Sequence, residues 1–135
     1  MTERSLQVVL VLAAAYNVVT GALALIAPDT FFDEIGRYGR ENSHYVGDNG
    51  AFALAAGIGL LIAVRRPVWR APLLWVGALW FGFHAINHAF DTGEARSEAR
   101  GIADTVLLAL AGVGSAYLAR VAESLQRGGA PGSVP

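Results

Sequence analysis

The sequence predicts an all-α membrane protein: four transmembrane helices in an antiparallel bundle, with a short interfacial helix between helices 1 and 2. Hydrophobic residues make up 54% of the 135 residues and charged residues 16%, well below the charged fraction of about a quarter in soluble domains. Four apolar runs, at about 6–27, 45–64, 71–90 and 101–121, are each long enough to cross about 30 Å of hydrocarbon as a helix.

The first run, 6–27, is too long for the apolar core of a signal peptide, and we interpret it as a retained helix. Pro28 ends it, and Asp29 or Thr30 can cap a short helix. That segment carries an apolar set at near-helical spacing: Phe31, Phe32, Ile35 and Tyr38. We expect it to lie on the outer membrane surface.

The second and third runs are joined by the short basic segment 65–70, which predicts a tight turn between antiparallel helices at a membrane surface. The fourth run is followed by a polar segment rich in Gly and Pro. We therefore expect a membrane domain over 1–122 and a disordered cytoplasmic tail over 123–135.

The arginines indicate the orientation. Six lie on the side of both termini: Arg4, Arg65, Arg66, Arg70, Arg120 and Arg127. Four lie on the opposite side: Arg37, Arg40, Arg96 and Arg100. The positive-inside rule then predicts a multi-pass protein of the cell membrane with both termini in the cytoplasm.

Small and polar residues predict how the helices pack. Small residues recur every fourth position at Gly47, Ala51, Ala55 and Gly59, and again at Gly112 and Ala116. Such stripes are typical of close helix contacts in lipid. Asn17, near the middle of the first run, is expected to form an interhelical hydrogen bond.

The ionisable residues within the predicted helices gather at the outer face, and they include all three histidines of the chain. At about 1.5 Å per residue, Asp48, His88 and Asp104 share one depth, with His84 about one turn deeper. Since buried charges in membranes are costly, this cluster is the candidate functional site.

His84 and His88 are spaced i, i+4, so both imidazoles can approach one cation. Asp48 and Asp104 would complete a divalent metal site for zinc, iron or manganese. The expected second shell or additional ligands are His44, Asp91 and Asn87.

Alternatives stay open. The cluster could be a metal-free network that relays protons or ties the helices of an accessory subunit in a larger membrane complex. It could also belong to a haem or quinone redox site, with Trp80 and Phe81 as pocket walls. The sequence names no reaction, so it does not decide whether the protein is an enzyme.

Composition also limits the partners. The chain has no cysteine, which excludes thiolate chemistry, and a net charge of -1 without a basic stripe gives no reason to expect nucleic acid. The expected partners are the lipid bilayer and either another membrane protein or further copies of the chain.

Three segments carry a family resemblance: 28–32 (PDTFF), 44–51 (HYVGDNGA) and 83–91 (FHAINHAFD). Together they resemble small bacterial four-helix integral membrane proteins, broadly DoxX-like. The resemblance implies the same four-helix topology. Some DoxX-like proteins are linked to quinone-dependent sulfur oxidation, but this chain lacks the cysteines that thiol-based sulfur chemistry would use.

Overall fold

The computed structural model describes residues 1–128, and the regular secondary structure in this range is helical, which confirms the all-α class. Five α-helices and two short 3-10 turns follow in order. They are α1 (Glu3–Ile26), α2 (Pro28–Glu34), α3 (Ser43–Arg65), η1 (Pro67–Trp69), α4 (Arg70–Phe90), η2 (Thr92–Glu94) and α5 (Glu98–Gly128).

Local sequence sets the helix boundaries. The backbone N–H of Ser5 donates to the Thr2 side chain over 3.1 Å, which caps α1. Pro28 opens α2, where its missing N–H costs nothing. The Asn42 side chain accepts from the backbone N–H groups of His44 and Tyr45 at 3.2 and 3.3 Å, and so caps α3.

Three of the helices, α1, α3 and α5, are long and apolar enough to cross a membrane, so the chain is built as a membrane protein. The fourth long helix, α4, is not among them. It has 21 residues, but its last two turns carry His84, Asn87 and His88, which lower its hydropathy.

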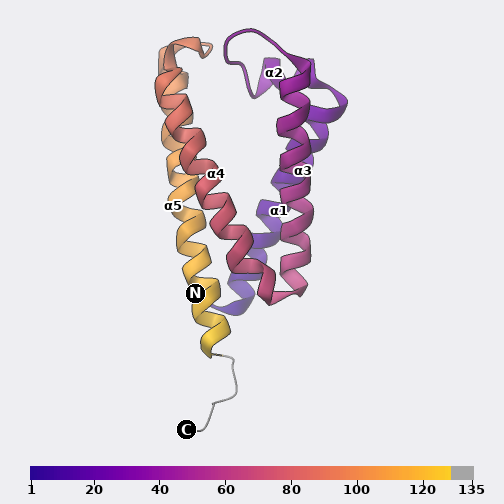
Figure 1. Cartoon of the computed structure of the whole chain (residues 1–135), viewed down its shortest axis with the longest axis vertical. Helices are drawn as coiled ribbons and strands as arrows, with labels where there is room; N and C mark the ends of the chain where they lie inside the picture. Colours follow the sequence, from indigo (N-terminus) through magenta and orange to yellow (C-terminus); the bar gives the residue numbers. More distant parts are fainter. Residues whose placement is uncertain (129–135) are drawn as a thin grey trace.

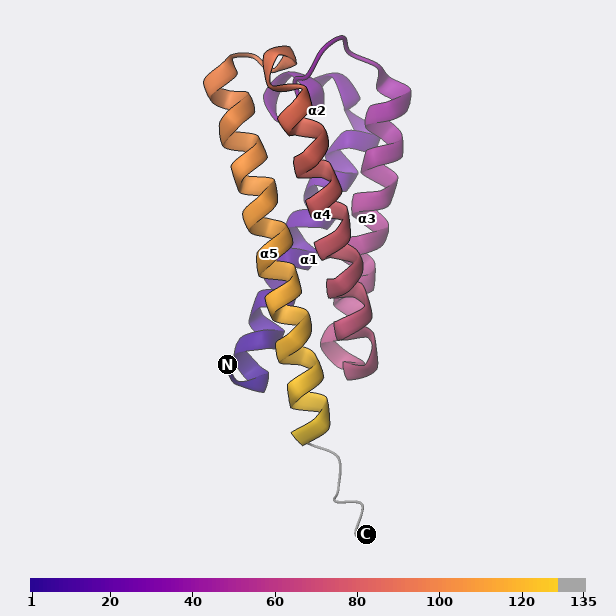
Figure 2. The ribbon, with the colours of Figure 1, turned by 60° about the vertical axis from the view of Figure 1, so that its left-hand side comes forward.

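The four long helices form two pairs. Figure 1 shows α1 alongside α3 and α4 alongside α5, and each pair packs along its length. The pairs meet where α1 begins and α5 ends, and they diverge toward the end that holds α2 (Figures 1 and 2). We call these the closed end and the α2 end.

Glycines let α1 and α3 approach closely. A Cβ built on Gly21 would lie 2.5 Å from the backbone nitrogen of Leu54, and one on Gly57 would lie 2.9 Å from that of Val18. Neither position has room for a side chain, so these glycines bring the two backbones into contact.

The predicted stripe on α3 is confirmed at Gly59, where a built Cβ would lie 3.3 Å from the Leu73 side chain of α4, and corrected at its other three positions. Gly47 has nothing within 4 Å of a built Cβ, and Ala51 and Ala55 are exposed, because the α1 contact lies on a neighbouring face of the helix. On α5 the prediction is confirmed at Gly112, whose built Cβ would lie 3.2 Å from the backbone nitrogen of Gly82 on α4.

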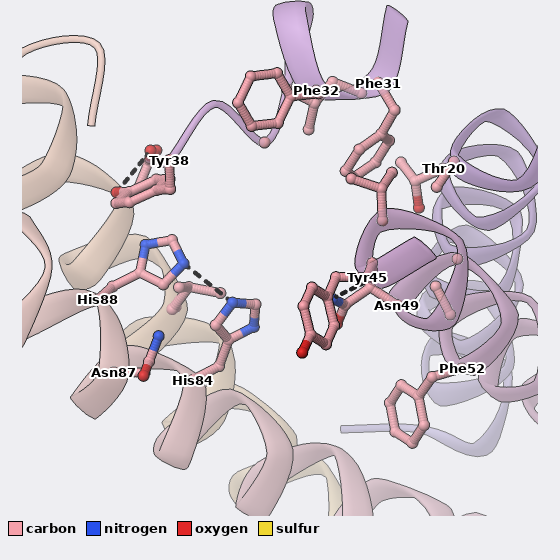
Figure 3. Close-up of a pocket in the computed structure, with 18 of the residues that line it drawn as sticks. Thr20, Phe31, Phe32, Tyr38, Tyr45, Asn49, Phe52, His84, Asn87 and His88 are labelled. Atoms are coloured by element: carbon pink, nitrogen blue, oxygen red, sulfur yellow. Dashed lines mark hydrogen bonds between the residues drawn. The ribbon is translucent and has the colours of Figure 1, made fainter. Parts of the chain in front are cut away.

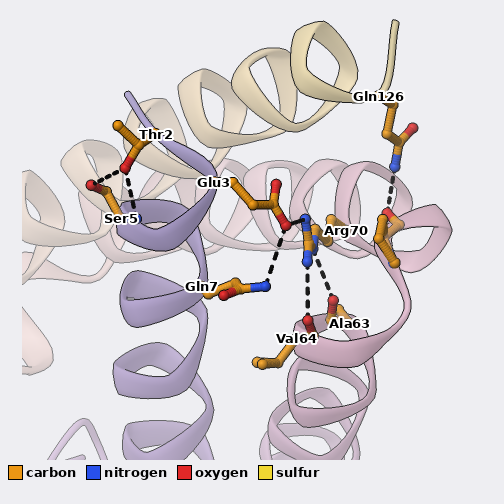
Figure 4. A network of polar contacts seen from close by, with 9 residues as sticks. Thr2, Glu3, Ser5, Gln7, Ala63, Val64, Arg70 and Gln126 are labelled. Atoms are coloured by element: carbon orange, nitrogen blue, oxygen red, sulfur yellow. Dashed lines mark hydrogen bonds and ion pairs between the residues drawn. The ribbon is translucent and has the colours of Figure 1, made fainter. Parts of the chain in front are cut away.

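A compact apolar core fills the closed end. All four long helices contribute to it: Leu6, Leu10, Ala14, Leu60, Ala71, Leu74, Ala119 and Ala122. Arg70 is buried beside it, with only 3% of its surface exposed. Its guanidinium donates to the carbonyl oxygens of Ala63 (2.9 Å) and Val64 (3.0 Å) and to the Glu3 carboxylate (2.6 Å) (Figure 4). The arginine thus satisfies the last carbonyls of α3 and ties α4 to α1.

The predicted disordered tail begins too early. α5 continues as a helix to Gly128, so 123–128 are ordered, and 129–135 lie outside the described residues. Glu123 explains the extension, because it accepts a hydrogen bond from the Trp75 indole at 2.8 Å and pairs with Arg120 and Arg127.

Candidate functional site

A cavity of about 670 Å³ lies between the two helix pairs at the α2 end. All four long helices line it, and residues from α2 and the segment that follows α2 complete its wall. Figure 3 shows His84 and His88 on one side of this space and Tyr45 and Asn49 on the other, with Phe31 and Phe32 toward the α2 side. The cavity holds much of the predicted cluster.

Polar side chains from all four long helices line the cavity. Each long helix contributes one residue that lies six positions from its end on the α2 side, which is about 9 Å along the axis. We call these residues the polar layer: Thr20, Asn49, His84 and Asp104. About one turn deeper, the lining is largely apolar and aromatic: Tyr16, Phe52, Ala53, Trp80, Phe81, Leu107 and Leu108, with Asn17 as its polar member.

In the described residues, the polar side chains with which α1 and α3 line the cavity bond only within their own helices. The Thr20 hydroxyl donates to the Tyr16 carbonyl at 2.8 Å, and the Asn49 amide donates to the Tyr45 carbonyl at 3.1 Å. Asn17 donates to the carbonyl of Ala13 at 2.8 Å, which corrects the predicted interhelical link.

The two histidines of α4 contact each other. Their Nε2 atoms lie 3.0 Å apart, as the i, i+4 spacing allows. In the neutral pair, one Nε2–H donates to the other bare Nε2, so the accepting ring carries its proton on Nδ1. Both Nδ1 atoms are buried without a partner in the described residues. One buried N–H donor is therefore unsatisfied, which is unfavourable by about 1–3 kcal/mol.

Tyr38 connects the histidine pair to Asp104. Its ring packs on that of His88 with centroids 4.2 Å apart, and its hydroxyl donates to the Asp104 carboxylate at 3.3 Å. Arg100 donates to the same carboxylate at 3.0 and 3.1 Å. Burial, and next the negative charge of Asp104, raise the pKa of Tyr38, which keeps the phenol a proton donor.

The segment of 35–42, which we call the strap, bridges the two helix pairs at the α2 end. Tyr38 forms an antiparallel β-bridge with Ala95, and the backbone N–H of Gly39 donates to the Glu94 carbonyl at 3.0 Å. Gly39 has a φ of 57°, a conformation that favours glycine. The Arg96 guanidinium also donates to the Asp33 carbonyl. The strap therefore covers the cavity from the α2 end.

Two aromatic side chains meet across the deeper part of the cavity. Phe52 of α3 stacks on Trp80 of α4 with ring centroids 4.2 Å apart. Trp80 also meets His84 edge-on at 5.7 Å. Trp80 and Phe81, the expected pocket walls, both line the cavity.

The structure divides the predicted metal ligands. His84, His88 and Asp104 line the cavity, but Asp48 is directed away and is 66% exposed. It lies 3.7 Å from His44 on the outer surface of α3. The prediction used only the depth of Asp48 along its helix. It did not consider which face of the helix carries the side chain. Asn87 donates to Asp91 at 3.3 Å, and both line the cavity.

Residues 1–128 contain no group of three or more His, Asp or Glu side chains placed to hold a metal ion. Asp104, which also lines the cavity, is already paired with Tyr38 and Arg100. The four-ligand set expected from the sequence is therefore not assembled in the described residues.

Sequence reasoning missed several lining residues: Thr20, Tyr38, Asn49 and Arg100. A signal for two of them was present. Asn49 lies one turn from Tyr45, and Thr20 lies three positions from Asn17, which places each pair on one helix face. The contacts of Tyr38 span 66 residues of sequence to Asp104, and no local pattern could predict them.

The fold and the site together define an all-α membrane protein with a cavity between two splayed helix pairs. Residues 5–85, more than half of the chain, match the model of a domain of unknown function (DUF4345). The chain belongs to this family. The matched region includes Thr20, Asn49 and His84 and ends before His88. No curated protein and no solved structure matches the chain.

Proposed function

We propose that this membrane protein binds a lipid-soluble small molecule, which carries a hydrogen-bonding group, in the cavity between its helix pairs. One observation carries the proposal: polar side chains from all four long helices face one space, and none bonds directly to another long helix in the described residues. If they served to hold the bundle together, they would bond across it.

The cavity has the character of a small-molecule site. Its volume of about 670 Å³ lies within the range of about 300–1,000 Å³ for ligand pockets, and its lining combines aromatic side chains with a few polar groups. The hydroxyl oxygen of Thr20 and the amide oxygen of Asn49 can each accept a hydrogen bond from a ligand. The imidazoles of the histidine pair are also available to it. A flat molecule with carbonyl or hydroxyl groups, such as a quinone, fits this combination.

Extraction of the protein with a native-lipid disc polymer, followed by mass spectrometry of the bound small molecules, tests the proposal. The parent should retain a compound in stoichiometric amount. Ala53→Trp, which fills the cavity floor, should lose it, whereas Ala55→Trp on the exposed face of α3 should keep it. Equal retention by both variants, or no retained compound in the parent, would contradict the proposal.

We infer that α4 is a fourth membrane span and that both termini are cytoplasmic. The apolar α1, α3 and α5 require α4 to return the chain across the bilayer, and the DoxX-like resemblance supports the same topology. The six-to-four division of arginines supports the orientation. A C-terminal alkaline phosphatase fusion should be inactive, and an active fusion would reverse the orientation.

A second candidate function is the binding of a divalent metal, such as zinc, iron or manganese, by the histidine pair. Two imidazole nitrogens on one tetrahedral zinc ion are about 3.4 Å apart, and the Nε2 atoms of His84 and His88 are 3.0 Å apart. With zinc added, the melting temperature of the parent should rise and that of His88→Gln should not. His44→Gln is the matched control, since His44 is 82% exposed and lies outside the cavity. An equal rise in all three proteins would exclude this site.

A further inference from the structure

We infer that the cavity exchanges its ligand with the bilayer through a lateral opening between α3 and α4. The ligand is then an uncharged compound dissolved in the leaflet on the α2 side. This inference rests on the proposed function and adds to it the route of entry and the class of the ligand.

The strap lies across the route from water at the α2 end. The strap is fixed to the α4–α5 connection by the Tyr38–Ala95 bridge and by the bond from Gly39 to Glu94. The Tyr38 hydroxyl also bonds to Asp104. Phe31, Phe32 and Ile35 add apolar side chains to the same end of the cavity wall. These contacts narrow the way into the cavity from water.

The side between α3 and α4 is open. These helices are joined through η1 at the closed end, and Phe52 stacks on Trp80 part of the way along them. Beyond this stack, lining residues from both helices are exposed: Tyr45 and Asn49 of α3 and Asn87 of α4. These three residues form a lateral rim of the cavity between α3 and α4. Tyr45 is 66% exposed there.

The charges of the lining indicate an uncharged ligand. The lining contains two arginines and two aspartates: Arg40, Arg100, Asp91 and Asp104. Arg100 and Asp104 neutralise each other through their ion pair. The remaining polar groups at ligand depth are a hydroxyl, an amide and imidazoles, which bind neutral donors and acceptors. A charged molecule would also be costly to bring in from lipid.

Thiol labelling tests the route, because the chain contains no cysteine. A single reporter, Thr20→Cys, places a thiol in the polar layer. In vesicles, a lipophilic uncharged maleimide should label it at least tenfold faster than a sulfonated maleimide supplied from water on the α2 side. Asn49→Trp, which narrows the lateral rim, should slow the lipophilic reagent severalfold.

Tyr38→Ala separates the two routes, since it removes the strap contacts to Asp104 and His88. It should accelerate the sulfonated reagent and leave the lipophilic rate unchanged. Thr105→Cys is the matched control, because Thr105 has the same bond to its own helix but lines the groove on the far side of α4 and α5. Its labelling should respond to neither Asn49→Trp nor Tyr38→Ala.

Rapid labelling of the Thr20→Cys parent by the sulfonated reagent would overturn the lateral route. So would a lipophilic rate that Asn49→Trp leaves unchanged. These outcomes concern access only, whereas the absence of a retained compound in the mass-spectrometric experiment contradicts the proposed function itself.

Discussion

The two ends of the molecule use their polar residues in opposite ways. At the closed end, Arg70 is 3% exposed and its guanidinium bonds to α3 and α1, beside a core to which all four long helices contribute. At the α2 end, Thr20 and Asn49 face a cavity, and within residues 1–128 they bond only to their own helices. The first arrangement joins helices, and the second leaves hydrogen-bonding capacity unused.

The residues that stabilise the bundle and those available for binding therefore lie at opposite ends of the molecule. Polar groups in a membrane protein are retained either because they link helices or because they contact something else. The closed end fulfils the first role and allows the pairs to diverge above it. The α2 end can then hold a space that a uniformly packed bundle would fill.

The largest effect is expected from Arg70→Met. The variant leaves the Ala63 and Val64 carbonyls without their donor, and buried acceptors without a partner cost about 1–3 kcal/mol each. We expect a loss of about 2–4 kcal/mol in the free energy of unfolding in detergent. Arg65→Met, at an exposed position of the same turn, should change it by less than about 0.5 kcal/mol. Equal losses of stability in the two variants would mean that the buried bonds of Arg70 do not hold the closed end together.

Glycine substitutions sharpen the account of the α1–α3 pair. Gly21→Ala should destabilise the protein by about 1–3 kcal/mol, because its Cβ would lie 2.5 Å from backbone on α3. Gly47→Ala should instead stabilise the protein by about 0.5–1 kcal/mol, since the surroundings of Gly47 are open and alanine favours the helix. Thermal unfolding of both variants measures this difference. A loss of stability in Gly47→Ala would mean that Gly47 does form the close helix contact that the sequence predicted.

Tyr38→Phe tests the strap. It removes one hydrogen bond to Asp104, measured at 3.3 Å, and keeps the ring against His88. A loss of about 0.5–1.5 kcal/mol in unfolding free energy is expected. Tyr117→Phe, at a position that is 60% exposed on α5, should show no loss. A neutral Tyr38→Phe would indicate that the strap is held by its backbone contacts alone.

The smallest effect is expected from Asn17→Leu. Because the amide bonds to Ala13 within α1, its removal breaks no link between helices, and stability should change by less than about 0.5 kcal/mol. Chemical denaturation of the variant and the parent provides the comparison. A loss near 2 kcal/mol would support the interhelical bond that the sequence predicted.

The sequence predicted the elements better than their arrangement. Apolar runs, Pro28 and the short basic segment 65–70 located the helices, because these are local properties. Depth along each helix placed His84, His88 and Asp104 correctly at one end. Rotation about each axis was harder, so Asp48 and the Gly47 stripe were assigned to the wrong face. The joining of the pairs at the closed end involves contacts such as Arg70 with Glu3, which are distant in sequence.

The central claim is that the polar layer does not hold the helix pairs together. The most direct measurement is the unfolding free energy of Thr20→Val/Asn49→Leu, compared with the parent after both have been stripped of bound lipid. The account predicts that the double variant loses less than about 1 kcal/mol, as Thr105→Val should, because only bonds within helices are removed. A loss of more than about 3 kcal/mol would mean that these side chains stabilise the bundle, and it would contradict the assignment of the cavity to a ligand.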